Sequence, residues 1–95
     1  MVWIVEYHPS VVRDLQSVST AGARAIVKAI DARIYRGEPH KSGKPLSGDL
    51  AGCRRIRVSD MRIIYQVDTR AHRVVILAVG MRRQDEVYKL AATRR

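Results

Sequence analysis

The chain has 95 residues, the size of one domain, and its hydrophobic fraction of 46% is typical of a folded globular protein. One cysteine excludes a disulfide framework and a cysteine-based zinc site, and the three histidines are too widely spaced for metal ligands, so the sequence predicts neither a metal nor a cofactor. The charge is the anomaly: 18 basic residues stand against 9 acidic ones, and a net charge of +9 is typical of proteins with a polyanionic partner.

The first half of the chain predicts a strand followed by two helices. Aromatic and β-branched residues alternate in residues 2–7, which indicates a strand. A short helix follows, with an apolar stripe at Val11, Val12 and Leu15. Ser19 or Thr20 can cap a second helix, which ends at Gly37 and Pro39. The apolar positions of this helix follow the helical period: Ala23, Ile26, Val27, Ile30 and Ile34. We expect the two helices to form an antiparallel hairpin.

The second half predicts a loop, three strands and a helix. Residues 38–52 hold three glycines and two prolines, which indicates a loop that Leu46 and Leu50 pin to the core. Apolar residues then recur at every second position, which predicts an antiparallel meander of three strands at residues 53–58, 61–68 and 73–80. Residues 85–92 predict a short helix with Asp85 as its cap. The last two residues predict a frayed tail, Arg94 and Arg95.

Together these elements predict one α+β domain over residues 1–95. It consists of an N-terminal strand, an α-helical hairpin, an antiparallel three-strand meander packed on the helices, and a short C-terminal helix. No apolar run is long enough to cross a bilayer, and the first residues lack the basic start of a signal peptide. We therefore expect a cytoplasmic protein with no membrane partner.

The excess positive charge is concentrated on the predicted meander. Residues 1–48 carry seven basic and four acidic residues, whereas residues 49–95 carry eleven and five. Strand alternation places Arg55 and Arg57 on one face of the sheet. Neighbouring strands bring further arginines toward that face, Arg62 and Arg82. A solvated sheet face is one interpretation of this pattern; the net charge favours a phosphate-binding surface.

Five segments of this chain form a recognisable pattern: GKPLSG at residues 43–48, CRRIRV at 53–58, MRIIYQV at 61–67, VGMRR at 79–83 and EVY at 86–88. They resemble the RelE branch of the RelE/ParE toxin superfamily. The resemblance covers nearly the whole chain and includes the predicted order of elements, which implies a RelE-like fold of the microbial ribonuclease type.

The resemblance implies a type II toxin that enters the A site of the 30S ribosomal subunit and inhibits translation by cleaving mRNA. Cleavage in this family uses the 2′-hydroxyl of the substrate as nucleophile and leaves a 2′,3′-cyclic phosphate. The matching catalytic positions are Arg55, Arg57, Arg62, Arg82 and Tyr88. Further RNA-binding residues are expected at Lys44, Arg54 and Arg83. The implied partners are a RelB-like antitoxin, the ribosome with its mRNA, and the operator DNA that the toxin–antitoxin complex binds.

The chain departs from the RelE pattern at the positions where a lysine could act as the general base. The family has lysines on the first strand of the meander, where this chain has Arg55 and Arg57. Arginine is effectively never deprotonated in proteins, so these residues are expected to hold RNA and stabilise charge. The general base is therefore open. Tyr88 is the first candidate, provided that its neighbours lower the pKa of a phenol; the alternatives are His72, Asp85 and Glu86.

Two other functions are compatible with a small basic domain of this kind. The first is a ParE-like inhibitor of DNA gyrase without catalysis of its own. The second is a non-catalytic nucleic-acid-binding protein, whose affinity would fall steeply with salt. The set of arginines and Tyr88 favours the endonuclease over both.

Overall fold

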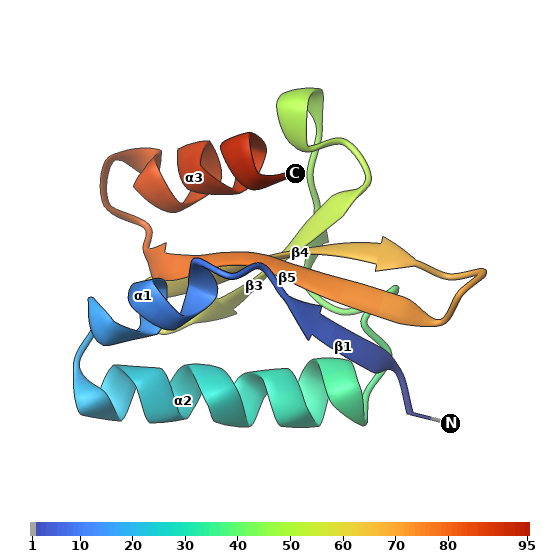
Figure 1. Ribbon diagram of the computed structural model, residues 1–95, viewed down its shortest axis with the longest axis horizontal. Coiled ribbons are helices and arrows are strands. Elements are labelled where there is room, and N and C mark those ends of the chain that lie inside the picture. Colours follow the sequence, from blue (N-terminus) through green and yellow to red (C-terminus); the bar gives the residue numbers. More distant parts are fainter. Residues whose placement is uncertain (1) are drawn as a thin grey trace.

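A mixed five-stranded sheet lies between helices on both of its faces in the computed structural model, which describes residues 2–95 (Figure 1). The helices are α1 (Val11–Gln16), α2 (Thr20–Ile30) and α3 (Glu86–Arg94). The strands are β1 (Ile4–Tyr7), β2 (Lys44–Pro45), β3 (Cys53–Val58), β4 (Met61–Asp68) and β5 (Arg73–Met81). The α+β fold and the order of the main elements are as the sequence predicts. Within the described residues, no helix is both long and apolar enough to span a membrane.

The sheet has the order β1-β5-β4-β3-β2. Its centre is the predicted antiparallel meander of β3, β4 and β5. The N-terminal strand β1 joins it parallel to β5, with Ile4 opposite Arg73. The prediction of an unbroken loop at residues 38–52 is wrong in one respect, because β2 within it pairs antiparallel with β3. A strand of two residues is too short to leave a periodic signal in the sequence.

The sheet buries apolar side chains on both faces. One layer packs against α1 and α2 and includes Ile26, Ile34, Ile56 and Ile63. The other packs against α3 and includes Ile64, Leu77, Val87 and Ala91. In β5 the alternation breaks at Leu77, because Ile64 pairs with Ala78 while its neighbour Tyr65 pairs with Ile76. The resulting bulge lets Leu77 and Ala78 both contribute to the layer under α3.

The helical hairpin forms through a capped second helix. The side chain of Ser19 accepts a hydrogen bond from the backbone N–H of Gly22 at 3.0 Å, which confirms Ser19 as the cap of α2. The apolar stripe of α2 faces the sheet, and the helix continues in a π-helical turn over Asp31–Tyr35. The loop after it is pinned by Leu50, whose side chain is buried under α3, as the sequence predicts.

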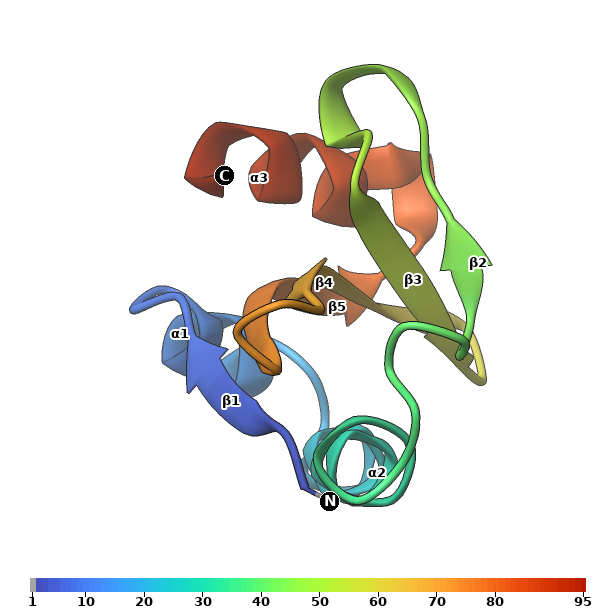
Figure 2. The same cartoon turned by 90° about the vertical axis from the view of Figure 1, so that its right-hand side faces the viewer.

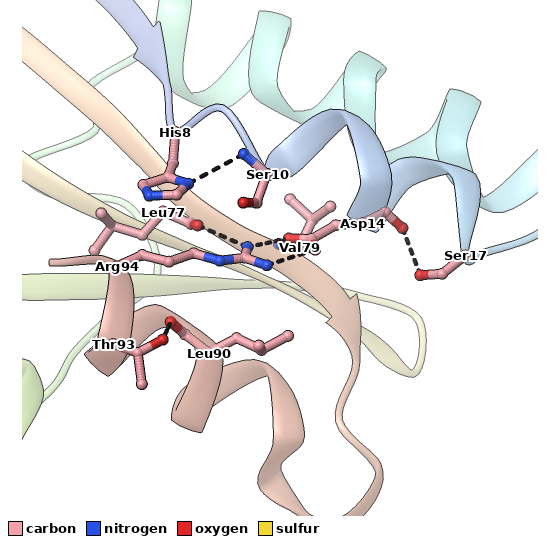
Figure 3. A network of polar contacts seen from close by, with 9 residues as sticks. All are labelled: His8, Ser10, Asp14, Ser17, Leu77, Val79, Leu90, Thr93 and Arg94. Carbon is pink, nitrogen blue, oxygen red and sulfur yellow. Dashed lines mark hydrogen bonds and ion pairs between the residues drawn. The ribbon is translucent and has the colours of Figure 1, made fainter.

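The C-terminal helix is held by a buried ion pair rather than ending in a frayed tail. Arg94 donates hydrogen bonds from Nη1 and Nη2 to the Asp14 carboxylate of α1, at 2.5 and 3.0 Å (Figure 3). Arg95 donates to the carbonyl of Asp49 at 2.9 Å. The predicted tail is therefore wrong, because its charges have partners that are distant in sequence. The helix begins at Glu86 and ends at Arg94, so the range predicted for it, residues 85–92, stops two residues early.

Candidate functional site

A basic pocket of about 320 Å³ opens on the face of the sheet that carries α3. Figure 2 shows α3 on this face of the sheet, with β2 and β3 below it. The lining residues come from β2, β3, β4 and the segment that leads into α3: Lys44, Leu46, Arg55, Arg57, Arg62, Arg82, Asp85 and Tyr88. The structure therefore brings together all five residues expected to be catalytic, and Lys44 with them.

Strand geometry places like charges opposite each other in this pocket. Arg55 and Arg57 are two residues apart on β3, and Ile56 between them is fully buried in the opposite layer. In the sheet register, Arg57 lies opposite Arg62 and Arg55 lies opposite Lys44. Like charges on directly opposed residues destabilise a sheet by a few tenths to about 1 kcal/mol per pair. Two such pairs in one pocket indicate a site that is completed by an anion.

Arg62 is the most buried cation of the pocket, with 4% of its surface exposed. Its Nη1 donates to the carbonyl of Met61 at 2.8 Å and to the carbonyl of Ser59 at 3.3 Å. Its Nε is buried and has no hydrogen-bond partner among residues 2–95. A buried guanidinium that keeps a free donor is a strong attractant for a phosphate oxygen. The backbone contacts fix the guanidinium in place before any ligand arrives.

The segment between β5 and α3 positions the other side of the pocket. The backbone N–H of Arg82 donates to the carbonyl of Asp60 at 3.1 Å, which ties this segment to the β3–β4 turn. Gln84 and Asp85 then adopt positive φ angles of 54° and 57°. Tyr88 follows in the first turn of α3 and is half-buried. The predicted cap is wrong, because Asp85 makes no side-chain capping hydrogen bond to the helix.

Two residues expected to bind RNA lie outside the pocket. Arg54 projects to the opposite side of β3, where its Nε donates to the carbonyl of Ser42 at 2.7 Å. Arg83 lines a separate cleft of about 390 Å³ together with Asp14 and Glu86. The RNA-binding roles of Arg54 and Arg83 stay predictions that this geometry does not support.

The structure separates the candidates for the general base. His72 lies at the β4–β5 turn, stacked on the indole ring of Trp3 with ring centroids 3.8 Å apart. Glu86 lines the separate cleft beside α1. Asp85 lines the basic pocket beside Tyr88. The sequence analysis names Asp85 both as a helix cap and as an alternative base; the structure shows no capping hydrogen bond and places this exposed residue in the wall of the basic pocket.

Cys53 belongs to the core rather than to the site. Its side chain is 1% exposed and packs in the layer under α3. Burial raises the pKa of the thiol, and the positive charge of Arg95 opposes this only in part. A thiol with a raised pKa is a poor nucleophile. Cys53 is therefore a structural residue of the core.

Comparisons of the sequence and of the structure with known proteins both match toxins of toxin–antitoxin systems. A family model described as the ParE toxin of the type II toxin–antitoxin system, parDE, matches residues 5–86. The toxin RelE of Mycobacterium tuberculosis is 37% identical over 70 residues, which are 74% of this chain and 71% of that protein.

Three solved structures are similar to this one. The RelBE2 toxin–antitoxin complex from M. tuberculosis matches with a TM-score of 0.77 and 32% identity, over 86% of this chain and 93% of that chain. The archaeal RelE–RelB complex from Pyrococcus horikoshii matches with a TM-score of 0.66 and 30% identity, over 88% and 99%. A mutant of the Escherichia coli toxin RelE matches with a TM-score of 0.78 at 22% identity, over 99% and 98%, which supports the fold alone. On the sequence matches, this chain belongs to the RelE/ParE family and is a RelE-type toxin of a type II toxin–antitoxin system.

Proposed function

We propose that this toxin is a ribosome-dependent endoribonuclease that cleaves mRNA in the A site by attack of the substrate 2′-hydroxyl on the adjacent phosphate. The observation that carries the proposal is the convergence of four arginines and one lysine on one pocket, with one of the arginines buried. Where the RelE pattern has two lysines, this chain has Arg55 and Arg57. The exchange strengthens phosphate binding, because a guanidinium contacts two phosphate oxygens at once.

The pocket suits the charge that develops during cleavage. In-line attack by a 2′-oxygen places negative charge on the non-bridging oxygens of a five-coordinate phosphorus. Arg62 is fixed by its backbone contacts, and Arg82 lines the same pocket. Donors that are fixed in advance need no reorganisation in the transition state, which makes them effective stabilisers. Tyr88 adds a phenol that can stack on a base or pass a proton.

Cleavage of translated mRNA by variants tests this proposal. Purified toxin is added to a translation extract, and cut sites are mapped by primer extension. Removing one fixed donor from a pocket of this kind costs about 10²–10³-fold in rate, so we expect this loss for Arg82→Ala and for Arg62→Ala. Arg24→Ala is the matched control, because Arg24 is an exposed arginine of α2, which covers the opposite face of the sheet (Figure 1). Cleavage by Arg82→Ala at the wild-type rate contradicts the proposal.

Inhibition of DNA gyrase is the second candidate function. It is favoured by the match of the ParE toxin family model to residues 5–86. A gyrase supercoiling assay separates the two functions, since an mRNA endonuclease leaves supercoiling unchanged. The basic pocket with Tyr88 favours the endonuclease, because a non-catalytic inhibitor has no need of a buried guanidinium whose Nε lacks a hydrogen-bond partner among residues 2–95.

We also propose a RelB-like antitoxin as the partner that neutralises this toxin in the cytoplasm, with the complex binding its own operator DNA. The M. tuberculosis and P. horikoshii relatives were solved as toxin–antitoxin complexes, which supports this partner. With a net charge of +9, the toxin favours an acidic antitoxin. Where a small acidic open reading frame adjoins its gene, co-expression of that product should abolish growth inhibition, and a gel-shift assay with the upstream DNA tests operator binding.

A further inference from the structure

One acidic residue lines the basic pocket, the exposed Asp85. The titratable and charged groups that line the pocket with it come from every element of its wall: Lys44, Arg55, Arg57, Arg62, Arg82 and Tyr88. Within residues 2–95, its side chain takes part in none of the four ion pairs and accepts no hydrogen bond from another side chain or from the backbone. A carboxylate that neither caps the helix nor pairs with a cation is free to accept a proton from a ligand.

The segment that carries this carboxylate adopts a backbone conformation with an energetic cost. Gln84 and Asp85 are consecutive non-glycine residues in the left-handed region. Each such residue costs on the order of 1 kcal/mol, and strain of this kind clusters at functional sites. An aspartate directly before a helix ordinarily accepts a hydrogen bond from the N–H groups of the first turn, which stabilises the helix by about 1 kcal/mol. Asp85 forgoes this stabilisation.

We propose that Asp85 is the general base of mRNA cleavage, an inference that rests on the proposed endonuclease function. Its carboxylate takes the proton as the 2′-O–H bond breaks and the 2′-oxygen forms a bond to phosphorus. The bond from phosphorus to the 5′-oxygen breaks, and this oxygen leaves with its electron pair and takes the phenolic proton of Tyr88. The products are a 2′,3′-cyclic phosphate and a 5′-hydroxyl. Solvent returns the proton from Asp85 to Tyr88, which restores both groups.

The other groups of the pocket are donors in this scheme. Arginine keeps its proton throughout the accessible pH range. A phenol and an exposed ammonium ordinarily carry their protons at neutral pH, whereas a carboxylate ordinarily lacks one and accepts hydrogen bonds only. Lys44 and Tyr88 are therefore suited to hold phosphate or protonate the leaving group. The pocket divides the two proton-transfer roles between Asp85 and Tyr88, one turn of helix apart.

The test is the single-turnover rate of mRNA cleavage on programmed ribosomes with saturating toxin. Asp85→Asn keeps the size of the side chain, and asparagine tolerates the left-handed region as well as aspartate does. We expect a rate loss of about 10²–10⁴-fold, the range for a missing general base, without weaker ribosome binding. Asp85→Glu should restore part of the rate.

The control is Asp49→Asn, which removes the same charge from an exposed position outside the pocket and should cleave as wild type does. If Asp85→Asn cleaves within threefold of wild type, the role of Asp85 is refuted while the endonuclease function stands. The role is also refuted if Asp85→Asn is slow only because it binds ribosomes more weakly, or if Asp85→Glu restores none of the lost rate. If the wild-type toxin cleaves no mRNA, the proposed function itself fails.

Discussion

Replacing Arg94 with methionine should destabilise the domain, because the substitution removes the ion pair that holds α3 to the rest of the fold. The Arg94 guanidinium donates to the Asp14 carboxylate through both Nη atoms, and its Nη1 also donates to the carbonyl of Leu77 at 3.1 Å. Asp14 additionally accepts a hydrogen bond from the backbone N–H of Val79 at 3.1 Å (Figure 3). This network joins α1, β5 and α3, so the variant leaves a buried carboxylate without its counter-charge.

The expected loss follows from the burial of the pair. The two side chains are 11% and 7% exposed, so solvent cannot replace the missing partner. Removing one member of a buried, hydrogen-bonded ion pair costs about 3–5 kcal/mol. The free energy of unfolding of a domain of this size is about 5–15 kcal/mol, so the loss is a large fraction of the total. Each kcal/mol lowers the Tm of a small domain by about 4–8 °C.

Urea unfolding followed by circular dichroism measures this loss. Arg95→Met is the matched control, because Arg95 is an exposed arginine whose contact is one carbonyl; we expect a change of about 0.5 kcal/mol or less. Adding Asp14→Asn to Arg94→Met removes the orphaned charge and keeps an oxygen for the Val79 N–H. The double variant should recover part of the loss. A change below about 1 kcal/mol in Arg94→Met refutes the assignment of the pair as a structural lock.

Three further predictions concern the loop beside the pocket and the core. Gly43→Ala should destabilise the fold by about 2 kcal/mol or more, measured by urea unfolding, because φ is +66° and a Cβ would lie 1.9 Å from the Arg55 carbonyl oxygen. Tyr65→Phe should cost about 1–2 kcal/mol at pH 7, because the buried hydroxyl donates to the Pro39 carbonyl at 2.8 Å. Burial raises the pKa of Tyr65, so the unfolded chain loses this proton first as pH rises; the native protein should lose stability above about pH 10, and the variant should lose less. Alkylation of Cys53 at pH 8 should be slow in the native state and rapid in urea, since burial raises the pKa of the thiol; equal rates in both states would contradict this.

Local patterns in the sequence determined the elements and the first part of the site. Period-two alternation identified β3, β4 and β5, and helical spacing with Ser19 as cap identified α2. Alternation also placed Arg55 and Arg57 on one face, and both line the pocket. These properties depend on residues close together in the chain, which is why a pattern can encode them.

Contacts between residues that are distant in the chain could not be predicted from the sequence. The two-residue strand β2 exists because β3 offers it an edge, and through it Lys44 reaches the pocket. The predicted frayed tail is instead anchored, because Arg94 pairs with the buried Asp14, which lies eighty positions earlier in the chain. No local spacing reports such a partner.

The role of the excess positive charge likewise depends on the tertiary structure. Composition alone determined that the protein has an excess of nine positive charges and therefore favours an anionic partner. The tertiary structure decided which of those charges converge, which one is buried with a free donor, and which are used elsewhere as structural contacts. It also decided that Asp85 lines the basic pocket and makes no capping hydrogen bond to α3, because the wall of a pocket is assembled from segments that are distant in the chain.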